Sequence, residues 1–276
     1  MNQISALVCT YHGDEANELQ AALQSLLTQT RPPDEIVVVE DGELTPRLNE
    51  TIRQVQQNAS IPLRRVAHSE NRGHGAARRT AVESANYELV AIQDADDISV
   101  PTRFERSTEV LNETGADLVG GFIAEFINDP DDPHSIREVP CEPSEIAEMA
   151  KIRSPVNHTT ILARRESILA VGSYRTVGQF EDYELWGRML VNGCKIVNIP
   201  EVLAKVRVDS EMYRRRGGLN HVKEEIRLQR HFLNIGFVSR PRAVYNTVVR
   251  SIPKLLPNVI REWMYRTLFR ENSDTK

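Results

Sequence analysis

Residues 89–101 read Leu-Val-Ala-Ile-Gln-Asp-Ala-Asp-Asp-Ile-Ser-Val-Pro, a short apolar run that ends in three aspartates. A continuous apolar run of this length is typical of a strand covered on both faces, as in parallel sheets. Similar runs stand upstream at residues 4–9, 36–39 and 63–67, and stretches with helical spacing separate them. This alternation predicts an α/β fold, with a Rossmann-like, doubly wound and mostly parallel sheet.

The helices and the later strands follow from the same periodicity. Apolar residues with helical spacing predict helices at residues 14–29 and 44–57 and one opening near Gly73. Beyond Pro101 we expect these elements, in chain order: a helix to residue 113, a strand opening at residue 117, a helix at 181–191, a short strand at 195–199 and a helical region from residue 219 onward.

Composition sets the class of protein. The 276 residues are 40% hydrophobic and 26% charged, which suffices for a core and argues against wholesale disorder. No apolar run approaches the roughly 18 residues of a membrane-spanning helix, and the N-terminus does not resemble a signal peptide. Three cysteines, odd in number and far apart, argue against a disulfide scaffold or a zinc site. They favour a reducing compartment, so we expect a cytoplasmic protein.

Charge is distributed unevenly along the chain. Residues 1–210 hold 20 Lys and Arg against 33 Asp and Glu, whereas residues 211–276 hold 14 against 6. A basic C-terminal quarter indicates contact with something anionic, such as a membrane surface or a phosphorylated lipid, or it is simply a solvated helical surface. Nucleic acid is not expected as a partner, because the acidic body offers no continuous basic face.

The aspartates after residue 93 stand where ligands bind in open α/β sheets, at the carboxyl end of a strand. Clustered carboxylates repel one another unless a cation or hydrogen-bond donors compensate them. Asp94 and Asp96 can therefore serve a ribose hydroxyl and a divalent metal, for which Mg²⁺ and Mn²⁺ are suited. The alternative is a solvated acidic turn, in which Asp97 or Ser99 caps the next helix.

The other predicted strand ends carry residues suited to a nucleotide. Tyr11 follows the first strand and offers a ring face to a base, and Asp41 follows the second and offers an acceptor for an imide N–H. Residues 71–79, Asn-Arg-Gly-His-Gly-Ala-Ala-Arg-Arg, follow the third strand. Their glycines permit close backbone approach at a helix N-terminus, and their arginines can neutralise a diphosphate.

Taken together, these segments resemble family 2 glycosyltransferases with the GT-A fold, over about residues 3–215. The resemblance rests on the strand ends described above and on residues 180–186, Phe-Glu-Asp-Tyr-Glu-Leu-Trp. It is nearest to bacterial and archaeal transferases that build capsule, O-antigen or exopolysaccharide units, including the amylovoran type. It implies an inverting transfer of a sugar from a nucleotide-diphosphate sugar, with uridine favoured as the base, to a glycan or a polyprenyl-diphosphate-linked acceptor.

The resemblance also implies roles for individual residues. Asp94 would hold the ribose, and Asp96, with Asp94 beside it, would hold a Mn²⁺ or Mg²⁺ ion that bridges the diphosphate. At position 9 the family often has proline, but the backbone there serves the same purpose. The full set implied to bind the nucleotide is Cys9, Thr10, Tyr11, Asp41, Arg72, Arg78, Asp94, Ala95 and Asp96.

A second acidic pair, Glu181 and Asp182, opens a predicted helix. Acids are favoured in a first helical turn by the helix dipole, which is a sufficient structural explanation. Inverting transfer, however, requires a base for the acceptor hydroxyl. The resemblance implies that Asp182 is this base and that Glu181 orients the acceptor or a cation. His158 and Trp186 are candidate acceptor-binding residues, although a lone histidine is more often structural and a tryptophan here more often belongs to the core.

The predicted organisation is a catalytic domain at residues 1–216 and a basic helical extension at residues 217–276. The catalytic domain would comprise a nucleotide-binding half of about residues 1–100 and an acceptor half of about residues 101–216. Residues 257–271 predict a basic amphipathic helix, which suits peripheral binding to the inner face of the cell membrane or packing on the protein.

Two rival functions remain open at this point. A sugar-nucleotide pyrophosphorylase would share the sheet and the metal carboxylates, but residues 12–15 lack the character of a glycine-rich triphosphate loop. A non-catalytic nucleotide-sugar-binding subunit would not need Asp94, Asp96 and Asp182 together.

Overall fold

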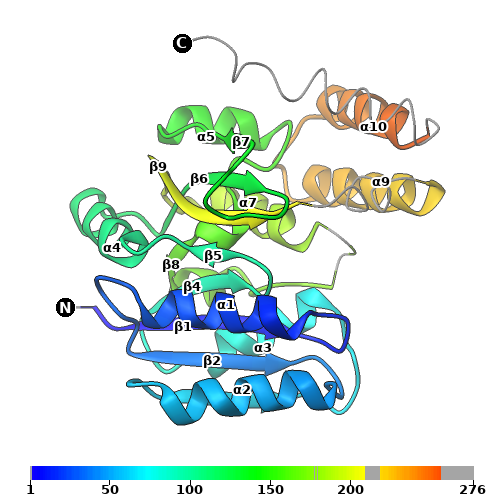
Figure 1. Ribbon diagram of the computed structural model, residues 1–276. Helices are drawn as coiled ribbons and strands as arrows, with labels where there is room; N and C mark the ends of the chain where they lie inside the picture. The colour runs from blue at the N-terminus through cyan, green and yellow to red at the C-terminus, as the bar shows by residue number, and fades with distance from the viewer. Residues whose placement is uncertain (1, 177, 179, 209–217, 256–276) are drawn as a thin grey trace.

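The computed structural model describes residues 2–176, 178, 180–208 and 218–255 (Figure 1). Its N-terminal half alternates strands and helices in the predicted order. The four strands lie parallel in the spatial order β3-β2-β1-β4, so their carboxyl ends share one edge. These elements are β1 (Ile4–Thr10), α1 (Ala16–Leu27), β2 (Glu35–Glu40), α2 (Pro46–Asn58), β3 (Leu63–Ala67), α3 (His74–Ser84) and β4 (Leu89–Asp94).

The second half extends the same sheet with strands in both directions. Next to β4 lies β8 in antiparallel orientation, then β6 antiparallel to β8, then β9 parallel to β6. Strand β5 pairs with β9 and β7 with β6, both antiparallel. The elements are β5 (Ile98–Ser99), α4 (Arg103–Thr114), β6 (Leu118–Phe126), β7 (Ser135–Arg137), α5 (Pro143–Ala150), the 3-10 helix η1 (His158–Thr160), β8 (Leu162–Arg164), α6 (Arg165–Ala170), α7 (Glu181–Val191) and β9 (Ile196–Arg207).

Strand β9 is longer than the predicted strand at 195–199. It follows β6 along its whole length, and the register shifts near Gly121 and Phe122. Pro200 and Glu201 interrupt the apolar pattern in the middle of β9, and proline normally argues against a continuous strand. Pairing with β6, which is a tertiary contact, therefore extends the strand beyond Pro200, where the local sequence predicts that it ends.

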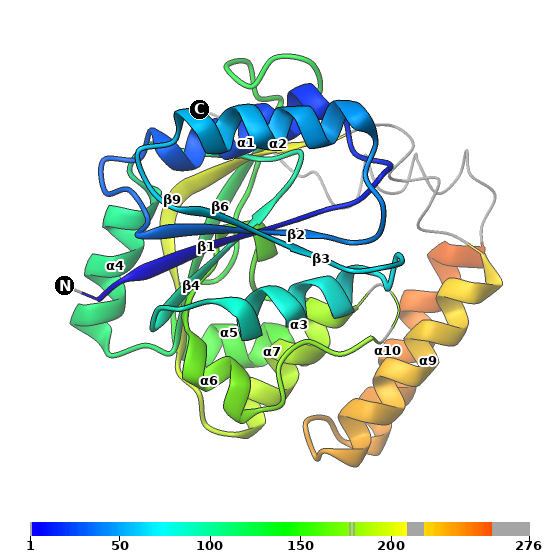
Figure 2. The ribbon, with the colours of Figure 1, turned by 90° about the horizontal axis from the view of Figure 1, so that it is seen from below.

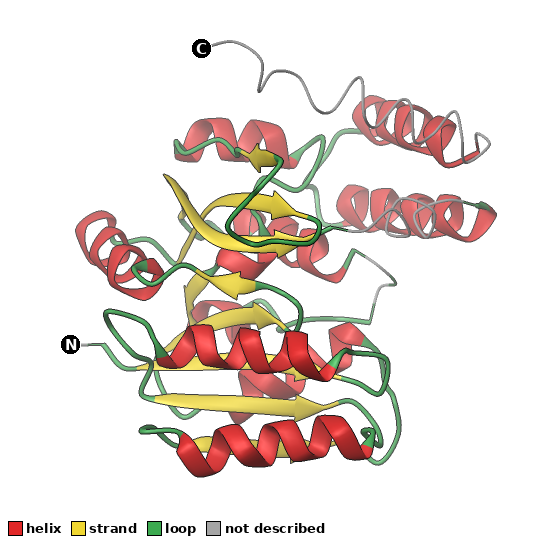
Figure 3. Cartoon of the chain, viewed as in Figure 1, coloured by secondary structure: helices red, strands yellow, loops and turns green. Residues whose placement is uncertain are grey.

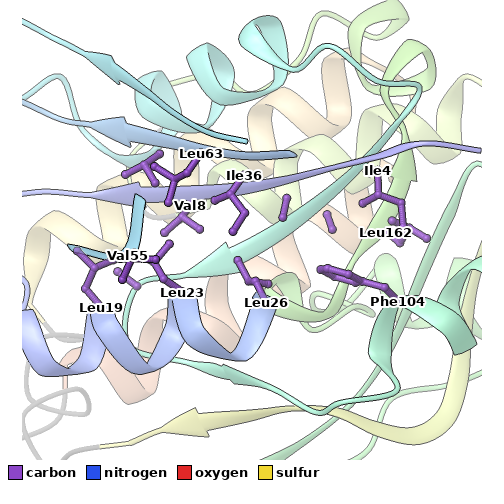
Figure 4. Close-up of a cluster of buried hydrophobic side chains, with 14 of the residues drawn as sticks. Ile4, Val8, Leu19, Leu23, Leu26, Ile36, Val55, Leu63, Phe104 and Leu162 are labelled. Carbon is purple, nitrogen blue, oxygen red and sulfur yellow. The ribbon is translucent and has the colours of Figure 1, made fainter. Parts of the chain in front are cut away.

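Helices cover both faces of the sheet (Figure 2). Because side chains alternate along a strand, Ile4 and Val8 of β1 point to one face and Leu7 to the other. On the first face, side chains of α1, α2 and α4 pack on the sheet, as Figure 4 shows for Leu23 and Phe104 among others. On the second face, side chains of α3, α5, α6 and α7 form a separate cluster.

The C-terminal part that the structure describes is a pair of helices, α9 (Leu219–Asn234) and α10 (Arg240–Leu255), which lie side by side (Figure 3). A third apolar cluster joins them to α7 through Tyr183 and Phe232. The helical region expected from Leu219 is thus confirmed. The division at residue 216 stays a prediction, and the predicted helix at 257–271 lies outside the described residues.

Among the helices of the described ranges, none has both the length and the apolar character that a bilayer span requires.

Candidate active site

Arg78 of α3 connects the two acidic segments of the predicted site. Its guanidinium donates to Oδ1 of Asp94 at 2.9 Å and also to Oε1 of Glu181. Burial opposes the charge of Arg78, but the carboxylates of Asp94 and Glu181 outweigh it and raise the pKa of Arg78 above its ordinary value. The end of β4 and the start of α7, far apart in sequence, therefore belong to one site.

Asp94 has a second neighbour in His158. Its Oδ2 lies 3.8 Å from Nδ1 of His158, and Nε2 of His158 lies 2.9 Å from the hydroxyl of Tyr174. Burial alone would raise the pKa of Asp94, but Arg78 and His158 hold it well below its ordinary value. Asp94 is consequently ionised at neutral pH, and the hydrogen bond from Arg78 fixes its position.

The three aspartates after residue 93 have different environments. Asp97 is 3% exposed, and its Oδ1 accepts a hydrogen bond from the backbone N–H of Arg207 at 3.3 Å. Asp96 keeps an exposed surface, yet desolvation by its surroundings and the charge of Asp94 raise its pKa to about 6. Ala95, between Asp94 and Asp96, is buried. The N-cap position of the next helix, α4, is Thr102, so neither Asp97 nor Ser99 caps it.

A divalent cation fits Asp96 better than Asp94. No group of three or more His, Cys, Asp or Glu residues that could hold a metal occurs in the described ranges. Asp96 presents a carboxylate without an ion-pair partner among those residues, whereas Asp94 is already bound to Arg78. Magnesium and manganese commonly take one or two carboxylates and complete their shells with water and substrate phosphates. The donor set thus suits an ion that arrives with a diphosphate.

At the end of β1, Asp14 organises the turn that carries Tyr11. Its Oδ2 accepts from the hydroxyl of Thr10 at 2.9 Å and from the backbone N–H of Tyr11 at 3.0 Å. The ring of Tyr11 also meets the ring of His74 edge-on, with centroids 6.2 Å apart. Cys9 lies beside Asp94 in the register of the sheet, and burial raises its pKa to about 12, so the thiol stays protonated.

Asp41 has a structural role that the sequence did not predict. Its Oδ1 accepts from the backbone N–H of Arg72 at 2.9 Å and lies 2.8 Å from Nδ1 of His68. Its Oδ2 accepts from the backbone N–H of Gly73 at 2.8 Å. The side chain is nearly buried, so it fixes the loop between β3 and α3. A contact with a base stays a prediction, for which one lone pair at most remains well placed.

The cations after β3 are not equivalent. Arg72 is exposed and has no ion pair with a described residue, whereas Arg79 donates to the carbonyl oxygens of Tyr174 and Gly172. A Cβ atom at Gly75 would lie 2.4 Å from the carbonyl oxygen of Arg175, so this glycine permits packing of α3 on that loop. Of the arginines expected at a diphosphate, Arg72 is the one with an open guanidinium.

The acids that open α7 also divide into a buried and an accessible member. Glu181 is 6% exposed, and its Oε2 has no hydrogen-bond partner within the described ranges. Asp182 is half-buried, and its Oδ1 accepts from the backbone N–H of Tyr183 at 2.7 Å. No ion pair with a described residue holds Asp182. Glu181 is thus fixed by Arg78, while Asp182 retains a carboxylate that a reactant can reach.

The prediction that Trp186 binds the acceptor is wrong. Its side chain is fully buried within the cluster on the α7 face of the sheet, so it offers no surface to a sugar. The ring of His158 lies 6.1 Å from that of Trp186, and its side chain is 8% exposed. His158 is therefore largely buried between Asp94 and Tyr174, and its contact with an acceptor stays a prediction.

Asp14, His68 and Tyr174 contribute to the site although the sequence did not single them out. Asp14 had a local signal, because it lies four residues after the end of β1 and aspartate is favoured in turns, where its side chain bonds nearby backbone groups. His68 and Tyr174 had none, since each acts on residues that are distant in the sequence.

Comparison with known proteins gives a family match and several similar chains. The model of the family described as glycosyl transferase family 2 matches residues 5–172. A relative from Escherichia coli, described as UDP-Gal:alpha-D-GlcNAc-diphosphoundecaprenol beta-1,3-galactosyltransferase, is 32% identical over 97% of this chain and 97% of its own. The amylovoran biosynthesis glycosyltransferase AmsE of Erwinia amylovora is 31% identical over 95% of this chain and 97% of its own.

Solved structures confirm the predicted GT-A fold class. TarS 1-349 of S. aureus, in complex with UDP-GlcNAc, superposes with a TM-score of 0.70 at 15% identity, covering 98% of this chain and 76% of TarS. The mannosyltransferase PcManGT of Pyrobaculum calidifontis, in complex with GDP-Man and Mn2+, gives a TM-score of 0.64 at 17% identity, covering 98% and 81%. Identities this low establish the fold alone. The family match spans more than half of the residues, so the chain belongs to glycosyl transferase family 2, the glycosyltransferases.

Proposed function

We propose that this glycosyltransferase moves a sugar, with inversion, from a UDP-sugar to a hydroxyl of a polyprenyl-diphosphate-linked glycan during surface-polysaccharide synthesis. The observation that carries the proposal is the bridge from Asp94 through Arg78 to Glu181, which unites the end of β4 with the acids of α7. The relatives named for a UDP-Gal donor, a diphosphoundecaprenol acceptor and amylovoran biosynthesis support the choice of substrates.

Asp182 is the proposed base. It would take the proton of the acceptor hydroxyl while that oxygen forms a bond to the anomeric carbon. The bond between this carbon and the diphosphate breaks on the opposite face, and its electron pair leaves with the diphosphate. Glu181, fixed by Arg78, would hold the start of α7 at a constant distance from the end of β4, where the donor would bind.

Residues at the strand ends would bind the nucleotide. Tyr11 would supply a ring face for the base, Asp94 the ribose contact, and the exposed Arg72 a charge for the diphosphate. Asp96 is the proposed metal ligand. A bound Mn²⁺ or Mg²⁺ ion would neutralise charge that develops on the departing diphosphate.

We also propose that the protein works in the cytoplasm at the inner face of the cell membrane. A lipid-linked acceptor is anchored in a bilayer, and the basic C-terminal quarter of the chain is complementary to an anionic surface.

Replacing the proposed base tests this function. We expect Asp182→Asn to abolish transfer, because an amide cannot accept the hydroxyl proton, while UDP affinity stays within about threefold of wild type. Product formation is measured by mass spectrometry with a panel of UDP-sugars, manganese and a lipid-diphosphate sugar acceptor, and UDP affinity by calorimetry. Asp97→Asn is the control that shows how a loss of folding alone affects both measurements. Asp97 is buried, and its carboxylate accepts a hydrogen bond from the backbone N–H of Arg207. Full transfer by the Asp182 variant would remove this residue from the mechanism.

A further inference from the structure

Helix α10 turns an apolar face outward. Its large apolar side chains recur every three or four residues, on one side of the helix, and are between 45% and 65% exposed: Val244, Tyr245, Val248, Val249 and Ile252. Such residues normally face the protein interior, and a contiguous exposed stripe of them marks an interaction site.

The polar side chains of α10 face inward and fix this orientation. Asn246 is 1% exposed and donates to the carbonyl oxygen of Lys151 at 2.7 Å and to Oε1 of Gln229 at 3.2 Å. Arg250 donates to Oε2 of Glu225 at 3.0 Å and to the carbonyl oxygen of Ile152 at 2.8 Å. Rotating the helix to hide its apolar stripe would break these hydrogen bonds, so the fold itself holds the stripe outward.

The charges of α10 complement an anionic surface. Residues 240–255 contain no acid, and of the cations on this helix Arg240 is exposed and Arg242 is partly exposed, whereas Arg250 faces inward and pairs with Glu225. The guanidinium carbon of Arg242 lies 6.0 Å from the ring centroid of Tyr245, at the edge of the stripe. Apolar side chains bordered by cations and an aromatic ring are the composition of helices that lie in the interface of anionic bilayers.

Helix α10 also contacts the segment that carries the proposed base. Arg250 lies over the rings of Phe180 and Tyr183, at 5.7 Å and 5.2 Å from their centroids, and these two residues flank Glu181 and Asp182. In the proposed function the acceptor sugar is linked to a lipid diphosphate. Its hydroxyl therefore stays near the membrane surface. A membrane contact on a helix that supports the start of α7 would bring the site to that hydroxyl.

We propose, resting on that function, that the outward face of α10 docks on the anionic phospholipid surface of the membrane that carries the acceptor. A second copy of the chain, or its own residues 256–276, are the rival occupants of the stripe.

The test compares vesicle binding by full-length variants. We expect Val244→Glu combined with Val248→Glu to lower partition onto phosphatidylglycerol-containing vesicles by at least about tenfold, because two valines leave the interface and two like charges approach it. Val191→Glu is the matched control, since Val191 is similarly exposed at the end of α7. Arg240→Gln with Arg242→Gln should weaken binding to these vesicles and leave the small binding to phosphatidylcholine vesicles unchanged. UDP affinity like that of wild type shows that each variant is folded.

Several outcomes would overturn the docking surface. They are no binding of wild type to the anionic vesicles, equal binding by the α10 double variant, or a wild-type dimer that this variant turns into a monomer. Transfer to a water-soluble sugar-diphosphate acceptor separates the two proposals. Normal transfer without vesicle binding refutes the docking alone, whereas vesicle binding that depends on α10 without any transfer refutes the function alone.

Discussion

Arg78 is a single cation shared by two carboxylates that the chain brings from opposite halves of the sequence. Its side chain is 12% exposed and that of Glu181 is 7%, so both charges have lost most of their water. Removal of one partner of a buried pair leaves the other charge uncompensated, which costs far more than the pair itself contributes. Arg78 is therefore expected to affect stability and turnover together.

We expect Arg78→Met to destabilise the protein by about 2–4 kcal/mol and to lower kcat more than donor affinity. The first effect comes from the unpaired carboxylates, and the second from the lost position of Glu181. Urea denaturation gives the stability, and steady-state kinetics give kcat and KM. Arg72→Met is the control for stability, because the guanidinium of Arg72 is exposed and pairs with no described residue. Equal stability of the two variants would mean that the bridge is not energetically significant.

Asp96 gives the site a pH dependence. Its pKa of about 6 means that the carboxylate is ionised at pH 7 and becomes protonated as the pH falls through 6. Because a divalent cation binds the ionised form, we expect affinity for manganese in the presence of UDP to fall about tenfold per pH unit below about pH 6. Calorimetry across about pH 5 to about pH 8 measures this. Asp96→Asn should weaken binding and abolish that dependence, and a wild-type affinity that is constant below pH 6 would contradict the assignment.

At the scale of elements, α7 is held from two sides. Leu185, Trp186 and Met189 face the sheet, as the predicted apolar face requires. On the other side, a Cβ atom at Gly187 would lie 2.5 Å from the ring of Phe232, so the absence of a side chain there lets α9 approach closely. Close by, Nε2 of His231 lies 2.8 Å from Oε1 of Glu184. Helix α9 thus supports the helix that carries the proposed base.

We expect Phe232→Ala to destabilise the protein by about 3–5 kcal/mol and to lower transfer activity. Phe232 is fully buried, its ring lies 5.0 Å from that of Tyr183, and its loss would leave a cavity beneath the start of α7. Leu219→Ala on the same helix should change stability by less than about 0.5 kcal/mol, because Leu219 is exposed. Both values come from denaturant unfolding. If the two variants lose stability alike, α9 does not support α7 through this ring.

At the scale of the whole molecule, the sheet explains where the site lies. The parallel strands β1, β2, β3 and β4 place their carboxyl ends at one edge, which gathers Tyr11, Asp41 and Asp94. Beyond β4 the sheet continues with the antiparallel strand β8, preceded by η1. This arrangement sets His158 beside Asp94 and leads the chain through α6 toward α7. The ends of the four parallel strands and the acid pair that opens α7 therefore lie at the same edge of one continuous sheet.

Much of the fold followed from the sequence. The strand Leu63–Ala67 and the helix Glu181–Val191 have their predicted bounds, and the other N-terminal elements differ at their ends by a few residues. Their signals are local, because apolar periodicity and helix-ending residues act within a few positions of each other. The β-α alternation then restricts the topology, since parallel crossovers have one hand.

The sequence by itself determined the elements of the first half, the family to which the chain belongs, and the acids that mark the site. Only the tertiary structure decided how each acid is used: Asp41 and Asp97 are buried and hydrogen-bonded, Asp94 is paired, and Asp96 and Asp182 remain accessible. It also placed Trp186 in the core and turned the apolar face of α10 outward. The reason is that charge state and exposure depend on neighbours that are distant in the chain, such as Arg78 for Glu181, and local patterns carry no information about them.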